Sequence, residues 1–106
     1  MKTINMIYVQ KIREQLDNEL LMGEDYCGLL DGYTLLVLTK GRKCTNENVH
    51  DAWSIWQNNE DSRHRSLIPF NELTKAVQDL DIKYRDAIIK VAKANLDRRL
   101  LFSWFH

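Results

Sequence analysis

The sequence predicts an all-α protein, folded as a compact single-domain bundle of four to five helices. Apolar residues recur at spacings of three and four along most of the chain, which is typical of amphipathic helices. A chain of 106 residues can bury one modest core but not two. Its 44% apolar and 28% charged content is that of a globular protein. We therefore take residues 1–106 as one helical domain, with residues 94–106 as a candidate oligomerisation or partner-binding extension.

The first predicted helix covers residues 3–22. Its apolar stripe consists of Ile4, Ile7, Tyr8, Ile12, Leu16, Leu20 and Leu21. Gly23 is well placed to end this helix, because glycine readily adopts the left-handed conformation that follows a last turn.

Residues 29–40 form an apolar segment that fits either a buried helix or a buried strand. Its leucine-rich composition favours a helix over residues 32–40, with Asp31 as a candidate N-cap and Gly41 as a stop. A strand stays open as the alternative, because short apolar runs carry no decisive periodicity.

A third helix is predicted over residues 46–58, with Thr45 as its N-cap. Its apolar face contains Val49, Ala52, Trp53 and Trp56. A polar loop follows and leads to Pro69, which suits the first turn of a short helix over residues 70–79.

Asp81 is a candidate cap for the last helix, which begins at residue 82. Its inward stripe is predicted to contain Tyr84, Ala87, Ile88, Val91 and Ala92, and Leu96 extends the same stripe. We expect the core to be built on Trp53, Trp56, Phe70 and Tyr84.

Charge and cysteine usage narrow the class of partner. The net charge is zero, which argues against nucleic acid as a partner. Residues 44–81 carry a charge of −4 and residues 82–106 a charge of +4, which indicates either internal pairing or a basic face for an anionic ligand. No apolar stretch is long enough to cross a membrane. Cys27 and Cys44 form no CxxC unit, so we expect free thiols inside a cell.

His50 and Trp53 are three residues apart and are therefore neighbours on a helix. In one interpretation, His50 is a buried histidine that hydrogen-bonds the following loop while Trp53 fills the core. In the other, His50, Trp53 and Trp56 line a ligand pocket whose aromatic faces stack a base, and Arg63 or Arg65 meets a phosphate.

The sequence contains no motif for catalysis or metal binding. Adjacent helical residues point apart, so His50 and Asp51 form no dyad, and the nucleophile and phosphate-loop motifs are absent. The residue types that could bind metal are present at Cys27, Cys44, His50, His64 and His106, but without recognised spacing. We expect no enzyme activity, no metal and no cofactor.

The tail carries large apolar side chains with nothing after it to cover them. Leu100, Leu101, Trp104 and Phe105 are candidate interface residues, because exposed apolar patches commonly mark interaction sites. They would contact a partner protein or a second copy of this chain.

Two stretches carry a resemblance to known families: Val49-His50-Asp51-Ala52-Trp53, and His64-Arg65-Ser66-Leu67-Ile68-Pro69-Phe70-Asn71-Glu72-Leu73. With Asp81 and Tyr84 after them, they resemble a family of small bacteriophage proteins with no established activity, over about residues 30–93. That resemblance implies a phage accessory protein in the host cytoplasm. The same stretches are also similar to the ryanodine-receptor repeat domain, a match carried by His50, Trp53, Leu67, Pro69, Phe70 and Leu73.

Prokaryotic versions of that repeat have been proposed to sense nucleotide-derived signals, although this chain lacks the longer aromatic and glycine segment between the two units. We therefore expect a non-enzymatic phage protein that sequesters or senses a nucleotide-type signal of host defence. The alternative is a protein-interaction module that inhibits or adapts a host or virion protein through its apolar tail.

Overall fold

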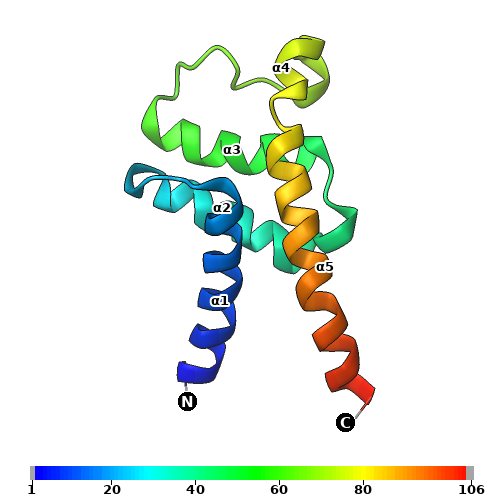
Figure 1. The fold of residues 1–106 in the computed structure, drawn as a ribbon. Helices are drawn as coiled ribbons and strands as arrows, with labels where there is room; N and C mark the ends of the chain where they lie inside the picture. The colour runs from blue at the N-terminus through cyan, green and yellow to red at the C-terminus, as the bar shows by residue number, and fades with distance from the viewer. Residues whose placement is uncertain (1, 105–106) are drawn as a thin grey trace.

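The all-α prediction is confirmed. The computed structural model describes the backbone of residues 2–104 and the side chains of residues 7–95. Five helices follow one another, and no strand occurs in this part of the chain (Figure 1). They are α1 (Lys2–Leu20), α2 (Cys27–Thr39), α3 (Asn46–Glu60), α4 (Lys75–Asp79) and α5 (Ile82–Trp104), with short 3-10 turns at Glu24–Tyr26, Gly41–Lys43 and Phe70–Glu72. The helix alternative for residues 29–40 is therefore correct.

Helix α1 ends earlier than predicted, and Gly23 does not end it. Leu21 adopts the left-handed conformation, with φ of 52°, while Gly23 has an extended φ of −80°. Asp17 closes the helix with two acceptors: its carbonyl oxygen accepts from the Leu21 amide at 2.6 Å, and its carboxylate Oδ1 accepts from the Met22 amide at 3.2 Å. The Asp17 side chain, in the last turn of α1, thus helps to end the helix where Gly23 was predicted to do so.

The predicted N-cap at Asp31 is also wrong, because α2 already begins at Cys27. Asp31 lies inside the helix and forms an ion pair with Arg13 of α1, with 2.6 Å between Arg13 Nε and Asp31 Oδ1. Gly41 does follow the helix with a φ of 55°, as the predicted stop requires.

The Thr45 cap of α3 is confirmed as a capping box. Its hydroxyl accepts from the Asn48 amide at 3.1 Å, and Asn48 Oδ1 accepts from the Thr45 amide at 3.0 Å. The single helix predicted over residues 70–79 is wrong. A 3-10 turn ends at Glu72, Leu73 is extended, and the Thr74 hydroxyl caps the separate helix α4.

The core lies around α2, which contacts α1, α3 and α5. Its most deeply buried side chains are Ile12, Leu16, Tyr33, Val49 and Ile88. The predicted inward stripe of α5 is confirmed from Tyr84 to Ala92, whereas Leu96 lies outside the described side chains.

The predicted aromatic core at Trp53, Trp56, Phe70 and Tyr84 is wrong, because all four side chains are only half-buried. Aliphatic side chains from helices distant in sequence fill the interior instead. The aromatic residues pack around its edge.

The predicted charge pairing between the middle of the chain and the last helix is not found among the described side chains. Lys90 of α5 pairs instead with Glu19 of α1 at 2.8 Å, and Arg85 pairs with its neighbour Asp86 at 2.9 Å. No helix in the described range has the length and apolar character of a membrane span.

Both chain ends lie at the same end of the molecule. The first turns of α1 and the last turns of α5 extend away from α2 and α3, while α4 and the loop before it lie at the opposite end (Figure 1). The predicted interface residues Leu100, Leu101 and Trp104 are in the helical backbone of α5, but their side chains, and Phe105 entirely, lie outside the described residues.

Candidate functional site

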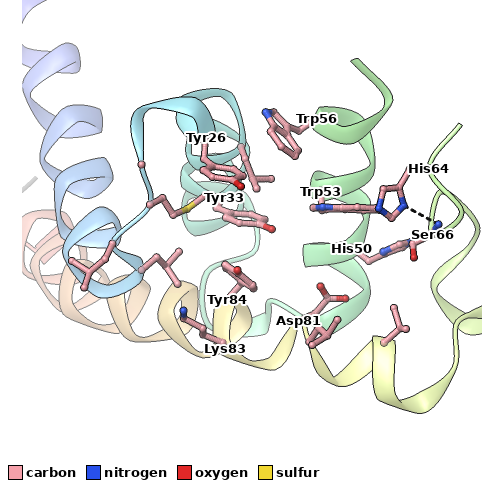
Figure 2. A pocket seen from close by; sticks show the side chains of 17 residues that line it. Tyr26, Tyr33, His50, Trp53, Trp56, His64, Ser66, Asp81, Lys83 and Tyr84 are labelled. Atoms are coloured by element: carbon pink, nitrogen blue, oxygen red, sulfur yellow. Dashed lines mark hydrogen bonds between the residues drawn. The ribbon is translucent and has the colours of Figure 1, made fainter. Parts of the chain in front are cut away.

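An open pocket of about 540 Å³ lies where the start of α2, the middle of α3 and the start of α5 meet. Aromatic rings make up much of its wall (Figure 2). The aromatic and imidazole side chains that line it are Tyr26, Tyr33, His50, Trp53, Trp56, His64 and Tyr84. We call this site the aromatic pocket.

The wall at α3 comes from Trp53 and Trp56, which are three residues apart and so share one helix face. Trp56 lies against the start of α2, where a Cβ atom at Gly28 would be only 3.2 Å from the indole Cδ1. The Tyr26 ring packs on the same indole, with ring centroids 5.5 Å apart. A glycine at residue 28 therefore allows the two helices to bring these rings together.

Tyr33 and Tyr84 also line the pocket, and their ring centroids are 5.3 Å apart. Tyr33 is almost fully buried, and burial raises its pKa strongly, with further contributions from Tyr84 and Asp81. Its hydroxyl group therefore stays neutral at ordinary pH.

His50 connects the pocket to the loop that follows α3. It is buried, and its Nε2 lies 2.7 Å from the Ile68 carbonyl oxygen, which can only accept a hydrogen bond. Nε2 therefore carries the proton and donates it to this carbonyl. The imidazole also stacks on Trp53, with centroids 5.5 Å apart and an interplanar angle of 23°. His50 thus makes the predicted loop contact and lines the pocket as well.

The same loop adds His64. Its ring meets Trp53 edge-on, with centroids 5.1 Å apart, and its Nδ1 accepts from the Ser66 amide at 3.0 Å (Figure 2). The turn of residues 62–66 therefore directs an imidazole, not a guanidinium group, toward the tryptophan.

Asp81 supplies the only carboxyl group among the lining residues that the structure describes. Burial raises its pKa to about 6, and His50 opposes this effect. Lys83 is the one lysine or arginine among the same residues, and its Nζ lies 5.7 Å from the centre of the Tyr84 ring.

Of the five predicted ligand-binding residues, the structure brings together His50, Trp53 and Trp56. Arg63 and Arg65 are exposed and do not line the pocket. His64 and Lys83 line the pocket without having been predicted to do so, and Asp81 and Tyr84 were predicted as a helix cap and a core residue. No sequence signal places His64 at the pocket, because side-chain directions in the turn of residues 62–66 depend on the local backbone.

The contact between Ser54 and His50 does not form a catalytic pair. The Ser54 hydroxyl lies 3.4 Å from His50 Nε2, but it donates to the His50 carbonyl at 2.7 Å. Because Nε2 donates to Ile68, it has no lone pair with which to accept the serine proton.

Neither cysteine is paired, as predicted, and burial raises the pKa of the Cys44 thiol to about 11. Among the residues that the structure describes, no three His, Cys, Asp or Glu side chains gather where they could hold a metal ion.

A second hollow, of about 570 Å³, lies between α1, the end of α2 and α5. Tyr8, Ile12 and Ala92 supply apolar surface to it, and Lys40, Arg42 and Lys43 supply positive charge. No predicted ligand-binding residue lies there.

The fold and the site define a small all-α protein with one aromatic pocket beside its core. The family model described as Domain of unknown function (DUF7701) matches residues 6–93, so the chain belongs to this family. No curated protein and no solved structure matches the chain. A family of unknown function agrees with the expectation of a family without an established activity, while the bacteriophage and ryanodine-receptor resemblances stay predictions.

Proposed function

We propose that this chain is a non-enzymatic binding protein whose aromatic pocket takes a small nucleotide-type molecule. The observation that carries the proposal is the pocket itself: about 540 Å³ of open space walled by tyrosine, tryptophan and histidine rings. Pockets of this size suit small-molecule ligands, and aromatic rings stack nucleobases with little regard to sequence. The Trp53 ring itself is stacked by His50 and met edge-on by His64.

The chemistry beside the pocket supports binding over catalysis. Where the side chains of Ser54 and His50 meet, both groups donate their protons to backbone carbonyls. Lys83 at the pocket, with Arg63 and Arg65 exposed in the loop around His64, supplies positive charge that would suit a phosphate group.

The biological setting of this proposal rests on the sequence resemblance to small bacteriophage proteins. In that setting the protein acts in the host cytoplasm, where it sequesters or senses a nucleotide-type signal of host defence. A binding protein suffices for that task, because sequestration needs affinity and no chemical step.

Calorimetry and tryptophan fluorescence against a panel of mononucleotides, cyclic nucleotides and ADP-ribose derivatives test the proposal. We expect at least one member to bind and to quench the fluorescence. Trp56→Leu should weaken that binding by roughly 10-fold, because a base–aromatic stack contributes about 1–3 kcal/mol. Ile55→Ala is the matched control, since Ile55 is on the same helix but 72% exposed. A folded protein that binds no member of the panel would refute the proposed function.

A further inference from the structure

The carboxyl group of Asp81 stands among the aromatic rings without a partner. In the close-up of the pocket it lies to the right of Tyr84 and below His50 and Trp53 (Figure 2). Within the described part of the chain, it forms no ion pair and no hydrogen bond. Asp81 is half-buried, so its carboxylate is partly shielded from water and no protein donor replaces the lost hydrogen bonds, which is unfavourable. A ligand that brings donors to Asp81 would recover that free energy.

An ionised carboxylate accepts hydrogen bonds through both oxygens and donates none. The ligand edge that suits it therefore has two donors side by side. Among the common bases, the pairing edge of guanine offers this arrangement, with a ring N–H next to an exocyclic amino group. Adenine and cytosine offer one amino group beside a ring nitrogen that accepts, and this acceptor would face a carboxylate oxygen. Uracil places its one N–H between two carbonyl groups.

We propose that the aromatic pocket selects a guanine base, which stacks on Trp53 or Trp56 and donates two hydrogen bonds to the Asp81 carboxylate. This inference rests on the proposed function, because it names the base within the nucleotide class. The sugar and phosphate then extend toward the open side of the pocket, where Lys83 is exposed.

A compact organic cation is the other ligand that aromatic rings and a carboxylate can hold. Two observations favour the base. The pocket volume of about 540 Å³ is much larger than a quaternary ammonium group needs. The rings also contact one another in pairs, Tyr26 with Trp56 and Tyr33 with Tyr84, so they are not all directed at a single point.

The first test compares guanosine, adenosine, cytidine and uridine monophosphates, with choline as the cation, by calorimetry at pH 7.5. We expect guanosine monophosphate to bind about 10-fold or more tightly than the other nucleotides, since a bidentate base contact discriminates by about 1–3 kcal/mol. Nucleotides that all bind equally would overturn the guanine inference and leave the proposed function standing. If choline alone binds, both the inference and the proposed function fail.

The second test replaces the Asp81 carboxylate, which only accepts hydrogen bonds, by an amide, which both accepts and donates them. Asp81→Asn replaces one carboxylate oxygen by an amide donor, which suits xanthine, with its N–H beside a carbonyl, and not guanine. We expect this variant to lose roughly 10-fold in affinity for guanosine monophosphate and to gain affinity for xanthosine monophosphate. Asp86→Asn is the matched control, because Asp86 lies outside the pocket in α5, the helix that directly follows Asp81, and pairs with Arg85. If the affinities of Asp81→Asn for guanosine and xanthosine monophosphate fall equally, Asp81 does not select the base.

The third test uses pH. A protonated Asp81 both donates and accepts, so it suits adenine better than guanine. The guanine preference should therefore fall as the pH is lowered from 7.5 to 5. The other titratable groups around Asp81 are His50, His64, Tyr33, Tyr84 and Lys83. Because these groups share the pocket with Asp81, the base preference of Asp81→Asn serves as the reference and should change little. Equal pH dependence in the two proteins would contradict the assignment to Asp81.

Discussion

At the scale of the residue, Asp81 is the side chain that the pocket keeps at a cost to folding. Burial raises its pKa from the ordinary value of 3.8 to about 6. The folded protein therefore binds this proton more tightly than the unfolded chain does. By linkage, the stability that this group contributes is fully present below pH 3.8 and is lost as the pH rises through about 6. A carboxyl group retained under such a penalty is a candidate for function.

The replacement Asp81→Asn removes this titration and keeps the shape of the side chain. We expect the variant to be more stable than the natural protein at pH 7.5, and the advantage to shrink as the pH falls toward 4. Urea denaturation at several pH values measures the difference, with Asp86→Asn, in the helix that directly follows Asp81, as the exposed control. A stability difference that does not change with pH would contradict the assigned cause.

Part of the pocket could be predicted from the residues alone. His50, Trp53 and Trp56 follow helical spacing, which fixes the face that they share. Arg63 and Arg65 follow no such rule, because in the turn of residues 62–66 the side-chain direction depends on the local backbone. In the sequence Asp81 has the pattern of a helix cap. Only the folded chain places it in the aromatic pocket beside His50, which is 31 residues earlier.

At the scale of the element, side-chain capping decides where several helices begin and end. Thr45 was predictable because it directly precedes a periodic segment, and its capping box confirms it. Asp17 and Thr74 were not recognised, since each lies where a continuous pattern predicts uninterrupted helix. Local hydrogen bonds from such short polar side chains compete with the helical pattern and cannot be ranked from spacing alone.

Removing the Thr45 hydroxyl should destabilise the fold through α3, the helix that carries Trp53 and Trp56. We expect Thr45→Ala to lower the free energy of unfolding by about 1 kcal/mol, the usual contribution of an N-cap. Urea denaturation measures the loss. Thr39→Ala is the control, because that hydroxyl only donates to the Leu35 carbonyl within α2. Equal losses in the two variants would mean that the capping box adds nothing beyond an ordinary hydroxyl contact.

At the scale of the whole molecule, α4 and the loop before it lie at one end, and the first turns of α1 and the last turns of α5 lie at the other (Figure 1). The all-α class was predictable because helical periodicity extends over most of the chain. The identity of the core was not, because burial depends on which helices meet. Aliphatic side chains such as Ile12 and Ile88 meet at the centre, and the larger tryptophans remain at its edge.

The end with the two chain termini has apolar surface that the rest of the domain leaves open. Ile7 is 65% exposed and Val9 is 39% exposed on α1. Two further apolar residues, Leu100 and Trp104, are one helical turn apart in the last part of α5. The family match ends at residue 93, so this part of α5 lies outside the region that defines the family. Apolar residues outside the core of a domain suit an interface with a second copy or a partner.

We predict that this tail makes the protein associate with itself. The full chain should show a mass in light scattering that rises with concentration above the 12.6 kDa of one copy. A chain ending at Asn95 should keep its fold, because it retains the buried α5 stripe and the contact of Asn95 with Gln15 of α1 at 2.6 Å. That shortened chain should remain at the mass of one copy, and so should a full chain with Leu100→Ser and Trp104→Ser. A full chain with Arg98→Ser, as control, should still associate. A constant single-copy mass for the full chain would contradict self-association and leave the tail available to a different protein. Association that survives both tail changes would locate the interface elsewhere. The exposed side chains of α1 would then be the next surface to change.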